Sequence, residues 1–175
     1  ITELEKSFRS GQNRALMVLA TGAGKTYTAC LAAYRMLSYT DMHRVLFLVD
    51  RNNLGRQAEN EFGTFRLTDN GEAFNTIFGV ERLKSAKIPS DSNVVISTIQ
   101  RLFSLLKGDD IVDDDNDDME DPETEVTLPD NPNLPHDFFD MIIIDECHRS
   151  IYKNWSKVLR YFDTARLVGL TATPI

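Results

Sequence analysis

The chain has 175 residues, of which 42% are hydrophobic and 26% charged, and its formal net charge at pH 7 is −8. This length suits one domain that buries roughly 70% of its unfolded surface. No apolar run approaches the roughly 20 residues of a membrane-spanning helix, and the charged start does not resemble a secretory signal. We therefore expect a cytoplasmic protein without a membrane partner. Because the first residue is not Met, we also expect a fragment of a longer chain.

Apolar patterns along the chain alternate between the periods of strands and helices. We expect helices at 2–9, 25–38, 52–62, 99–106 and 154–161, and strands at 15–20, 44–50, 74–79, 94–98, 141–145 and 166–172. Strands that alternate with helices predict a parallel sheet with right-handed crossovers and helices on both faces. The expected fold is thus a three-layer α/β domain over residues 1–175.

A glycine-rich loop follows the first expected strand. It consists of Ala20, Thr21, Gly22, Ala23, Gly24, Lys25 and Thr26. Glycines let backbone N–H groups point at an anion, and the N-terminus of the next helix attracts negative charge. The loop is predicted to bind ATP, with Lys25 at the β- and γ-phosphates and Thr26 on Mg²⁺. Leu19 stands where the usual motif begins with glycine, so a plain glycine-rich turn remains the alternative.

Two later strands end in side chains that suit a nucleic-acid backbone. The candidates for DNA contact are Arg51, Asn52, Gln57, Thr98, Gln100 and Arg101. Backbone amides at the start of helix 52–62, together with Arg51, could meet a phosphate. Simple capping and turn chemistry is the alternative for this segment.

An acidic insertion occupies about residues 108–135. Residues 109–125 contain eleven Asp and Glu side chains and no Lys or Arg; without them 16 acidic side chains stand against 19 basic ones, a balance of +3. Such dense like charges repel and extend, so we expect a solvated surface loop. A partner contact or a DNA-mimicking strip is one alternative. A metal site at Asp113, Asp115 and Asp117 is another, although the Gly and Glu of a calcium-binding loop are missing.

A continuous apolar run from Met141 to Ile144 leads into Asp145 and Glu146. A run that is apolar at every position suits a central parallel strand, and ligands bind at the carboxyl ends of such strands. Asp145 is therefore predicted to hold Mg²⁺ and Glu146 to orient and deprotonate the attacking water. The alternative is a strand that ends in a solvated acidic turn.

The last expected strand, 166–172, ends in two hydroxyl side chains and a proline. Thr171 and Thr173 are predicted to hydrogen-bond to the turn at 145–148 and so to report the nucleotide state. An ordinary strand end is the alternative for these two threonines.

Taken in order, these segments resemble the first motor domain of superfamily 2 helicases and translocases, a RecA-like P-loop domain. The matching segments are Ala20–Thr26 (motif I), Phe47–Gln57 (Ia), Val94–Arg101 (Ib), Asp145–His148 (II) and Gly169–Pro174 (III). Two segments are also similar in amino-acid sequence to the motor subunit of type I restriction endonucleases. They are Asp50–Gln57, and Phe138–Met141 running into Asp145–Ser150.

The resemblance implies a Mg²⁺- and ATP-dependent translocase that acts on double-stranded DNA. It implies that His148 couples the nucleotide site to the nucleic acid, and that motifs Ia and Ib touch one strand's backbone. It also implies a second RecA-like domain with catalytic arginines and a nuclease domain in the parent chain, and separate methylation and specificity subunits. We therefore expect the fragment alone to hydrolyse ATP slowly at best.

Two other interpretations remain open. One is a different superfamily 2 enzyme, a DNA or RNA helicase that separates strands. The other is a degenerate motor that serves as a nucleotide-binding scaffold, against which Lys25, Asp145 and Glu146 argue.

Overall fold

The computed structural model describes residues 1–20, 24–109, 127–147 and 153–173. The strands are β1 (Arg14–Val18), β2 (Val45–Val49), β3 (Gly79–Arg82), β4 (Ser92–Thr98), β5 (Met141–Ile144) and β6 (Arg166–Thr171). The helices are α1 (Thr2–Arg9), α2 (Lys25–Tyr39), α3 (Asn52–Thr64), α4 (Phe74–Ile77), α5 (Ile99–Lys107) and α6 (Lys153–Tyr161). Within this described part, no helix has both the length and the apolarity needed to cross a bilayer.

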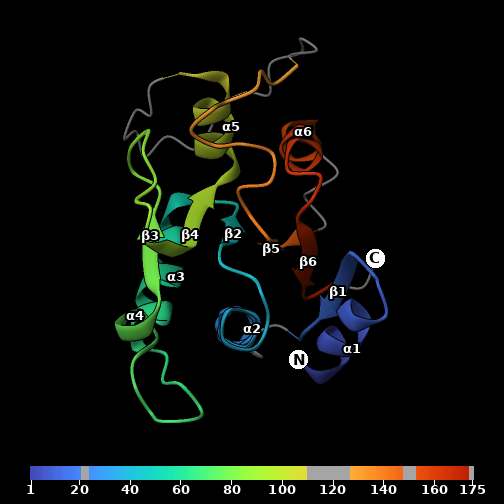
Figure 1. Ribbon diagram of the computed structural model, residues 1–175, viewed down its shortest axis with the longest axis vertical. Coiled ribbons are helices and arrows are strands. Elements are labelled where there is room, and N and C mark those ends of the chain that lie inside the picture. Colours follow the sequence, from blue (N-terminus) through green and yellow to red (C-terminus); the bar gives the residue numbers. More distant parts are fainter. Residues whose placement is uncertain (21–23, 110–126, 148–152, 174–175) are drawn as a thin grey trace.

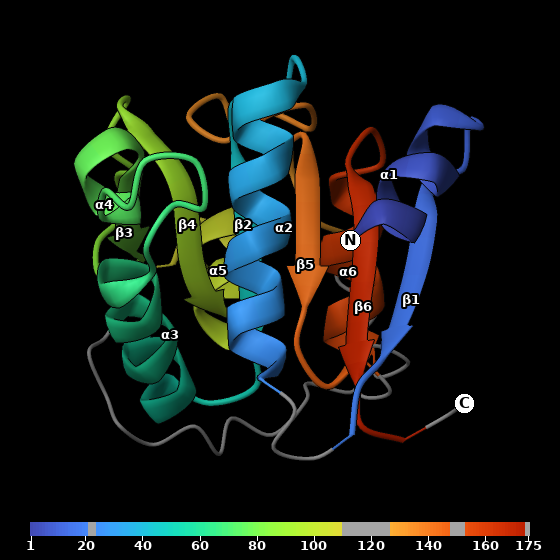
Figure 2. The same ribbon diagram turned by 90° about the horizontal axis from the view of Figure 1, so that it is seen from below.

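All six strands form one parallel sheet in the order β1-β6-β5-β2-β4-β3. Helices α1 to α4 lie on one face and α5 and α6 on the other, which gives three layers (Figures 1 and 2). The predicted α/β fold with helices on both faces is therefore confirmed. Because every strand points the same way, all carboxyl ends meet at one edge of the sheet.

The central strands β2 and β5 are buried throughout because helices cover both of their faces. Alternate side chains of these strands enter two separate cores. Phe47 and Ile143 pack towards α2 and α3, whereas Leu46 and Ile142 pack towards α5 and α6. This burial anchors the residues that follow each strand at the carboxyl edge.

The predicted strand at 74–79 is wrong. Residues 74–77 form the short helix α4, and the strand β3 begins only at Gly79. Phe74 and Phe78 stand four positions apart, and their rings lie 5.2 Å from each other, centroid to centroid. Phe74 is fully buried and also packs 5.2 Å from Phe62 of α3. The apolar spacing of four positions therefore serves a helical turn within an aromatic cluster, and not a strand.

Strand β1 forms one edge of the sheet and pairs only with β6 among the described strands. Its Ala15 and Met17 pack against the core on the α1 side. Leu16 and Val18 point to the other face, and each is 48% exposed. Within the described part of the chain, the layer of α5 and α6 thus does not cover this end of the sheet.

Candidate nucleotide-binding site

The described part of the glycine-rich loop leads straight into α2. Gly24 caps the helix in the left-handed conformation, with φ 73°, which favours glycine. The Thr28 hydroxyl donates to the Gly24 carbonyl oxygen at 3.1 Å and steadies the first turn. Thr21, Gly22 and Ala23 lie outside the described residues. The N-terminal end of α2 therefore opens at the carboxyl edge of the sheet, as an anion site requires.

Lys25 lies between the two carboxylates that end β5. Its Nζ is 3.8 Å from Asp145 Oδ1 and forms an ion pair with the Glu146 carboxylate. The three side chains are largely shielded, with exposures of 18% for Lys25, 15% for Asp145 and 30% for Glu146. The fold thus brings the predicted phosphate-binding lysine to the predicted catalytic acids, which are 120 and 121 positions away in the chain.

Asp145 is held firmly by its backbone and by its neighbours. Its N–H donates to the Leu48 carbonyl oxygen at 2.9 Å, and its Oδ1 accepts from the Glu146 N–H at 3.0 Å. Burial raises the pKa of the Asp145 carboxyl, the Lys25 ammonium opposes that rise, and the Glu146 carboxylate adds to it. A buried carboxylate beside another one is stabilised by a cation, so the site favours positive charge next to Asp145.

The residues present fit a bound Mg²⁺. Asp145 supplies a hard oxygen donor, and the half-buried Thr26 stands next to Lys25 at the start of α2. Among the described residues no group of three or more acidic, His or Cys side chains could hold a metal ion. Mg²⁺ in nucleotide sites is held by one or two protein ligands together with phosphates and water, so two protein oxygens suffice.

Glu146 has a left-handed backbone with φ 50° and is the only non-glycine residue with positive φ in the described chain. This conformation costs a non-glycine residue roughly 1–2 kcal/mol. Such strain clusters at functional sites, where the surroundings hold a side chain in a required direction. Here it turns Glu146 back towards Lys25 as soon as β5 ends.

The end of β6 lies beside the same turn. The Thr171 hydroxyl donates to the Thr173 carbonyl oxygen and accepts from the Thr173 N–H, both at 3.1 Å. The Thr171 carbonyl oxygen accepts from Leu19 N–H at 2.9 Å, which ties β6 to the entrance of the nucleotide loop. The predicted contact of both threonines with residues 145–148 stays a prediction, because His148 lies outside the described residues.

Sequence reasoning did not anticipate the role of Gly169 in this turn. A Cβ at position 169 would lie 2.7 Å from Cys147 Sγ and 3.0 Å from Cys147 Cβ. Glycine therefore lets the Asp145–Cys147 turn pack directly on the backbone of β6. An isolated glycine within an apolar strand is the sequence signal for such a close approach.

The DNA candidates after β2 lie on the surface of α3. Arg51 and Gln57 are exposed. Arg51 Nε is 3.7 Å from Asp50 Oδ2, and Gln57 Nε2 donates to Glu61 Oε1 at 3.4 Å. Asn52 begins the helix, but its side chain is outside the described set. The first two side chains are thus placed where a nucleic acid could reach them.

The candidates after β4 turn inward. Thr98 is buried, and its hydroxyl caps α5 by accepting from the Arg101 N–H at 3.3 Å. Arg101 is also buried and donates to the Leu83 carbonyl oxygen at 3.0 Å. Gln100 has a buried Oε1 that finds no hydrogen-bond partner among the residues that the structure describes. Thr98 and Arg101 thus have structural roles in the fold, and contact of these three residues with DNA stays a prediction.

A strand, a glycine-rich loop and a helix that present a lysine to two carboxylates on a parallel sheet define the P-loop class of α/β nucleotide-binding domains. Over residues 1–175 the chain matches the family model described as "Type III restriction enzyme, res subunit", and it belongs to that family.

Two relatives of known type show which kind of restriction enzyme this chain is similar to. The chain is 31% identical over 194 residues to the type I restriction enzyme EcoKI endonuclease subunit of Escherichia coli strain K12, which covers 99% of this chain and 14% of that protein. It is 32% identical over 181 residues to the EcoAI endonuclease subunit of Escherichia coli, with 99% and 18% covered. The expected resemblance to type I restriction subunits is confirmed, and the chain spans less than a fifth of these relatives.

Solved structures agree on the fold. The UvsW helicase from bacteriophage T4 has a TM-score of 0.58 at 18% identity, covering 91% of this chain and 46% of that one. The Hef helicase domain from Pyrococcus furiosus has a TM-score of 0.60 at 24% identity, with 93% and 30% covered. The type ISP restriction-modification enzyme LlaGI, solved with a DNA substrate mimic, has a TM-score of 0.56 at 18% identity, with 98% and 17% covered.

Proposed function

We propose that this chain is the first ATP-hydrolysing motor domain of a DNA translocase, the endonuclease (R) subunit of a type I restriction-modification enzyme. The observation that carries the proposal is Lys25 at the start of α2, held by Asp145 and Glu146 at the carboxyl edge of the sheet. The similarity to two type I endonuclease subunits over 99% of the chain supports the choice of system.

The site residues divide the work of phosphoryl transfer between binding and activation. Lys25 and the backbone N–H groups at the start of α2 bind the β- and γ-phosphates of ATP. Thr26 and Asp145 would hold Mg²⁺, which neutralises phosphate charge when bound. Glu146 orients the attacking water and accepts its proton.

The ion pair between Lys25 and Glu146 adds a step before catalysis. While Lys25 contacts the Glu146 carboxylate, that carboxylate is engaged by the ammonium. Phosphates that arrive at the loop compete for the Lys25 ammonium and release Glu146 towards water. Nucleotide binding thereby frees Glu146 to act as the base for the attacking water.

Duplex DNA is the proposed substrate of the motor. Arg51, Gln57 and the start of α3 would track one strand through its sugar–phosphate backbone, which carries no sequence information by itself. Target choice would fall to specificity and methylation subunits. His148, a second RecA-like domain with its arginines, and a nuclease domain in the parent chain complete the proposed machine.

ATP hydrolysis by the full-length parent protein, with any companion subunits, tests this proposal on duplex DNA, single-stranded DNA and RNA. We expect duplex DNA to stimulate hydrolysis. We expect Glu146→Gln to lower kcat by about 100-fold or more, the usual contribution of a general base, while ATP binding persists. The exposed Glu3→Gln serves as the matched control and should hydrolyse ATP normally.

Stimulation by single strands or RNA alone would instead identify a strand-separating helicase. ATP binding without hydrolysis by the wild-type protein on any of these nucleic acids would identify a scaffold. Either result contradicts the proposed translocase.

A further inference from the structure

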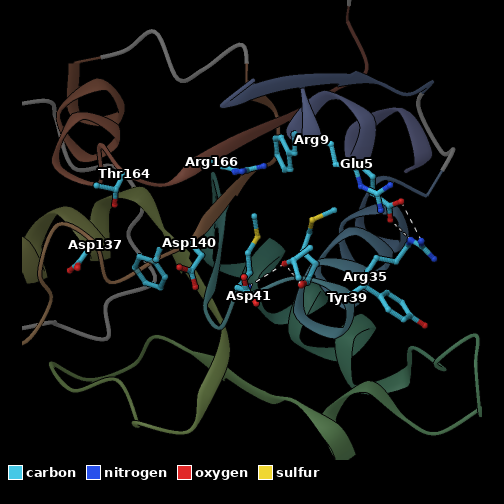
Figure 3. Close-up of a pocket in the computed structure, with 14 residues that line it drawn as sticks. Glu5, Arg9, Arg35, Tyr39, Asp41, Asp137, Asp140, Thr164 and Arg166 are labelled. Atoms are coloured by element: carbon cyan, nitrogen blue, oxygen red, sulfur yellow. Dashed lines mark hydrogen bonds and ion pairs between the residues drawn. The ribbon is translucent and has the colours of Figure 1, made fainter. Parts of the chain in front are cut away.

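A pocket opens at the amino-terminal edge of the sheet, opposite the nucleotide loop. It encloses about 570 Å³, a volume within the usual range of ligand sites. Its walls come from α1, the last turn of α2 and the residues that lead into β2, β5 and β6 (Figure 3). None of the proposed nucleotide or DNA residues lines it.

The floor of this pocket is apolar. Phe8, Met36 and Phe139 are buried beneath it, and Met42 is half-buried at its side. Methionine side chains adapt their shape to what they contact. Such a floor suits a single apolar or aromatic side chain from a binding partner.

One wall of the pocket carries an excess of basic side chains, since its one carboxylate, Glu5, is paired with Arg35. The Arg166 guanidinium lies 4.8 Å from the centre of the Phe8 ring, and Arg9 projects from α1 as an exposed side chain. Neither arginine forms an ion pair with a carboxylate of the described residues. A guanidinium that lies on an aromatic ring keeps its edge donors available for a carboxylate.

The opposite wall is acidic. Asp41 and Asp137 are exposed at the rim and form no ion pair with any described residue. Asp140 is already engaged, because its Oδ2 accepts from the backbone N–H groups of His43 at 2.7 Å and Arg44 at 3.0 Å. These carboxylates repel a phosphate backbone, so the pocket does not suit a nucleic acid.

We propose that this pocket seats a segment of the parent chain that lies outside residues 1–175. The segment would place an apolar side chain on the Phe8–Met36–Phe139 floor, a carboxylate at Arg166 and Arg9, and a basic group at Asp41 and Asp137. This inference rests on the proposed function, since the type I relatives extend far beyond the matched region. Docking here leaves the nucleotide edge open.

Photo-crosslinking of the full-length parent protein tests the inference without any need for ATP. p-Benzoylphenylalanine replaces Tyr39, an aromatic residue on the pocket lining that is 56% exposed. The matched control carries the same probe at Ile77 of α4, which is 50% exposed and does not line the pocket. Mass spectrometry then locates the products. We expect the Tyr39 probe, and not the Ile77 probe, to join an amphipathic segment elsewhere in the same chain.

Charge variants test the chemistry of the contact. Arg166→Glu should lower the yield of that product roughly tenfold, as expected for the loss of one good charge pair. Arg160→Glu, on the exposed surface of α6, should leave it unchanged. Asp41→Lys tests the other wall and does not disturb the Arg166–Phe8 contact.

Three outcomes would overturn the inference: no product above the Ile77 level, a product with a companion subunit instead of the same chain, or a product indifferent to both charge variants. Because crosslinking is read apart from hydrolysis, an inactive enzyme that still crosslinks would contradict the proposed function alone.

Discussion

At the scale of single residues, the contact between Gly169 and Cys147 joins two functional segments. Replacing Gly169 by Ala places a methyl group 2.7 Å from Cys147 Sγ and 3.3 Å from Leu16 Cδ1. We expect the free energy of unfolding to fall by about 1–3 kcal/mol, the usual cost of overpacking. We also expect slower ATP hydrolysis, since the displaced Cys147 follows Glu146. Urea unfolding and an ATPase assay measure both effects.

Two further variants control that experiment. Cys147→Ala removes the sulfur that the new methyl group would meet, so Gly169→Ala should cost less in that background. Gly63→Ala, inside α3 with its nearest neighbour at 3.6 Å, should be neutral or stabilising because alanine favours helix. Equal losses in both Cys147 backgrounds would contradict this account of the contact.

The sequence predicted which segments meet in the fold better than it predicted where individual side chains point. Lys25, Asp145 and Glu146 meet as expected because a parallel sheet brings the ends of its strands to one edge. Arg101 followed the same reasoning, yet its guanidinium turns inward to the Leu83 carbonyl oxygen. The position of residue 83 depends on strand β3, which the pattern misplaced. Contacts between distant segments therefore could not be read from local spacing.

At the scale of elements, His136 fastens the segment that follows the acidic insertion to α6. Its Nδ1 lies 2.6 Å from the Tyr161 carbonyl oxygen and its Nε2 lies 2.8 Å from Asp130 Oδ1. Both ring nitrogens face acceptors, so only the protonated imidazolium can donate to both. The Tyr161 carbonyl first, and then Asp130, raise the pKa of His136 above its ordinary value.

This raised pKa predicts a stability that depends on pH. The contribution of His136 is fully present below about pH 6.5, the value for an unperturbed histidine, and is lost as pH rises through the raised pKa. We expect the thermal unfolding temperature of His136→Gln to lie below that of the wild type at acidic pH and to equal it at alkaline pH. His43→Gln, at an exposed site, is the control. A difference that persists at alkaline pH would contradict the ionic origin.

The helices and strands could be predicted where one apolar period ran without interruption. Strand β2 and helix α2 were found within two residues of their observed ends. Helix α4 was missed because four residues are too short to display a helical period. Its conformation is decided by the burial of Phe74 against Phe62, which local sequence cannot reveal.

At the scale of the whole molecule, the net negative charge depends on one segment. Deleting residues 109–125 changes the formal net charge from −8 to +3. The ATP site lies on α2 and β5, so we expect the affinity for ATP to stay unchanged. We expect binding of duplex DNA to tighten at low salt, because like charges are removed. Titration with a fluorescent ATP analogue and with DNA at several salt concentrations measures both.

The deletion needs one companion variant. Lys25→Ala in the deleted chain should abolish ATP binding, which shows that the measured signal comes from the loop. A large loss of ATP affinity in the deletion alone would mean that the insertion supports the nucleotide site.

Strand β1 has a consequence for how the domain behaves in concentrated solution. It leads into the nucleotide loop, and among the described residues no strand pairs with its outer edge, while Leu16 and Val18 are each 48% exposed. An apolar edge strand of this kind is a template for another chain. At high concentration the isolated domain should therefore self-associate through the strand that delivers its lysine to ATP. Charged substitutions at Leu16 or Val18 are the direct route to a preparation that stays monomeric.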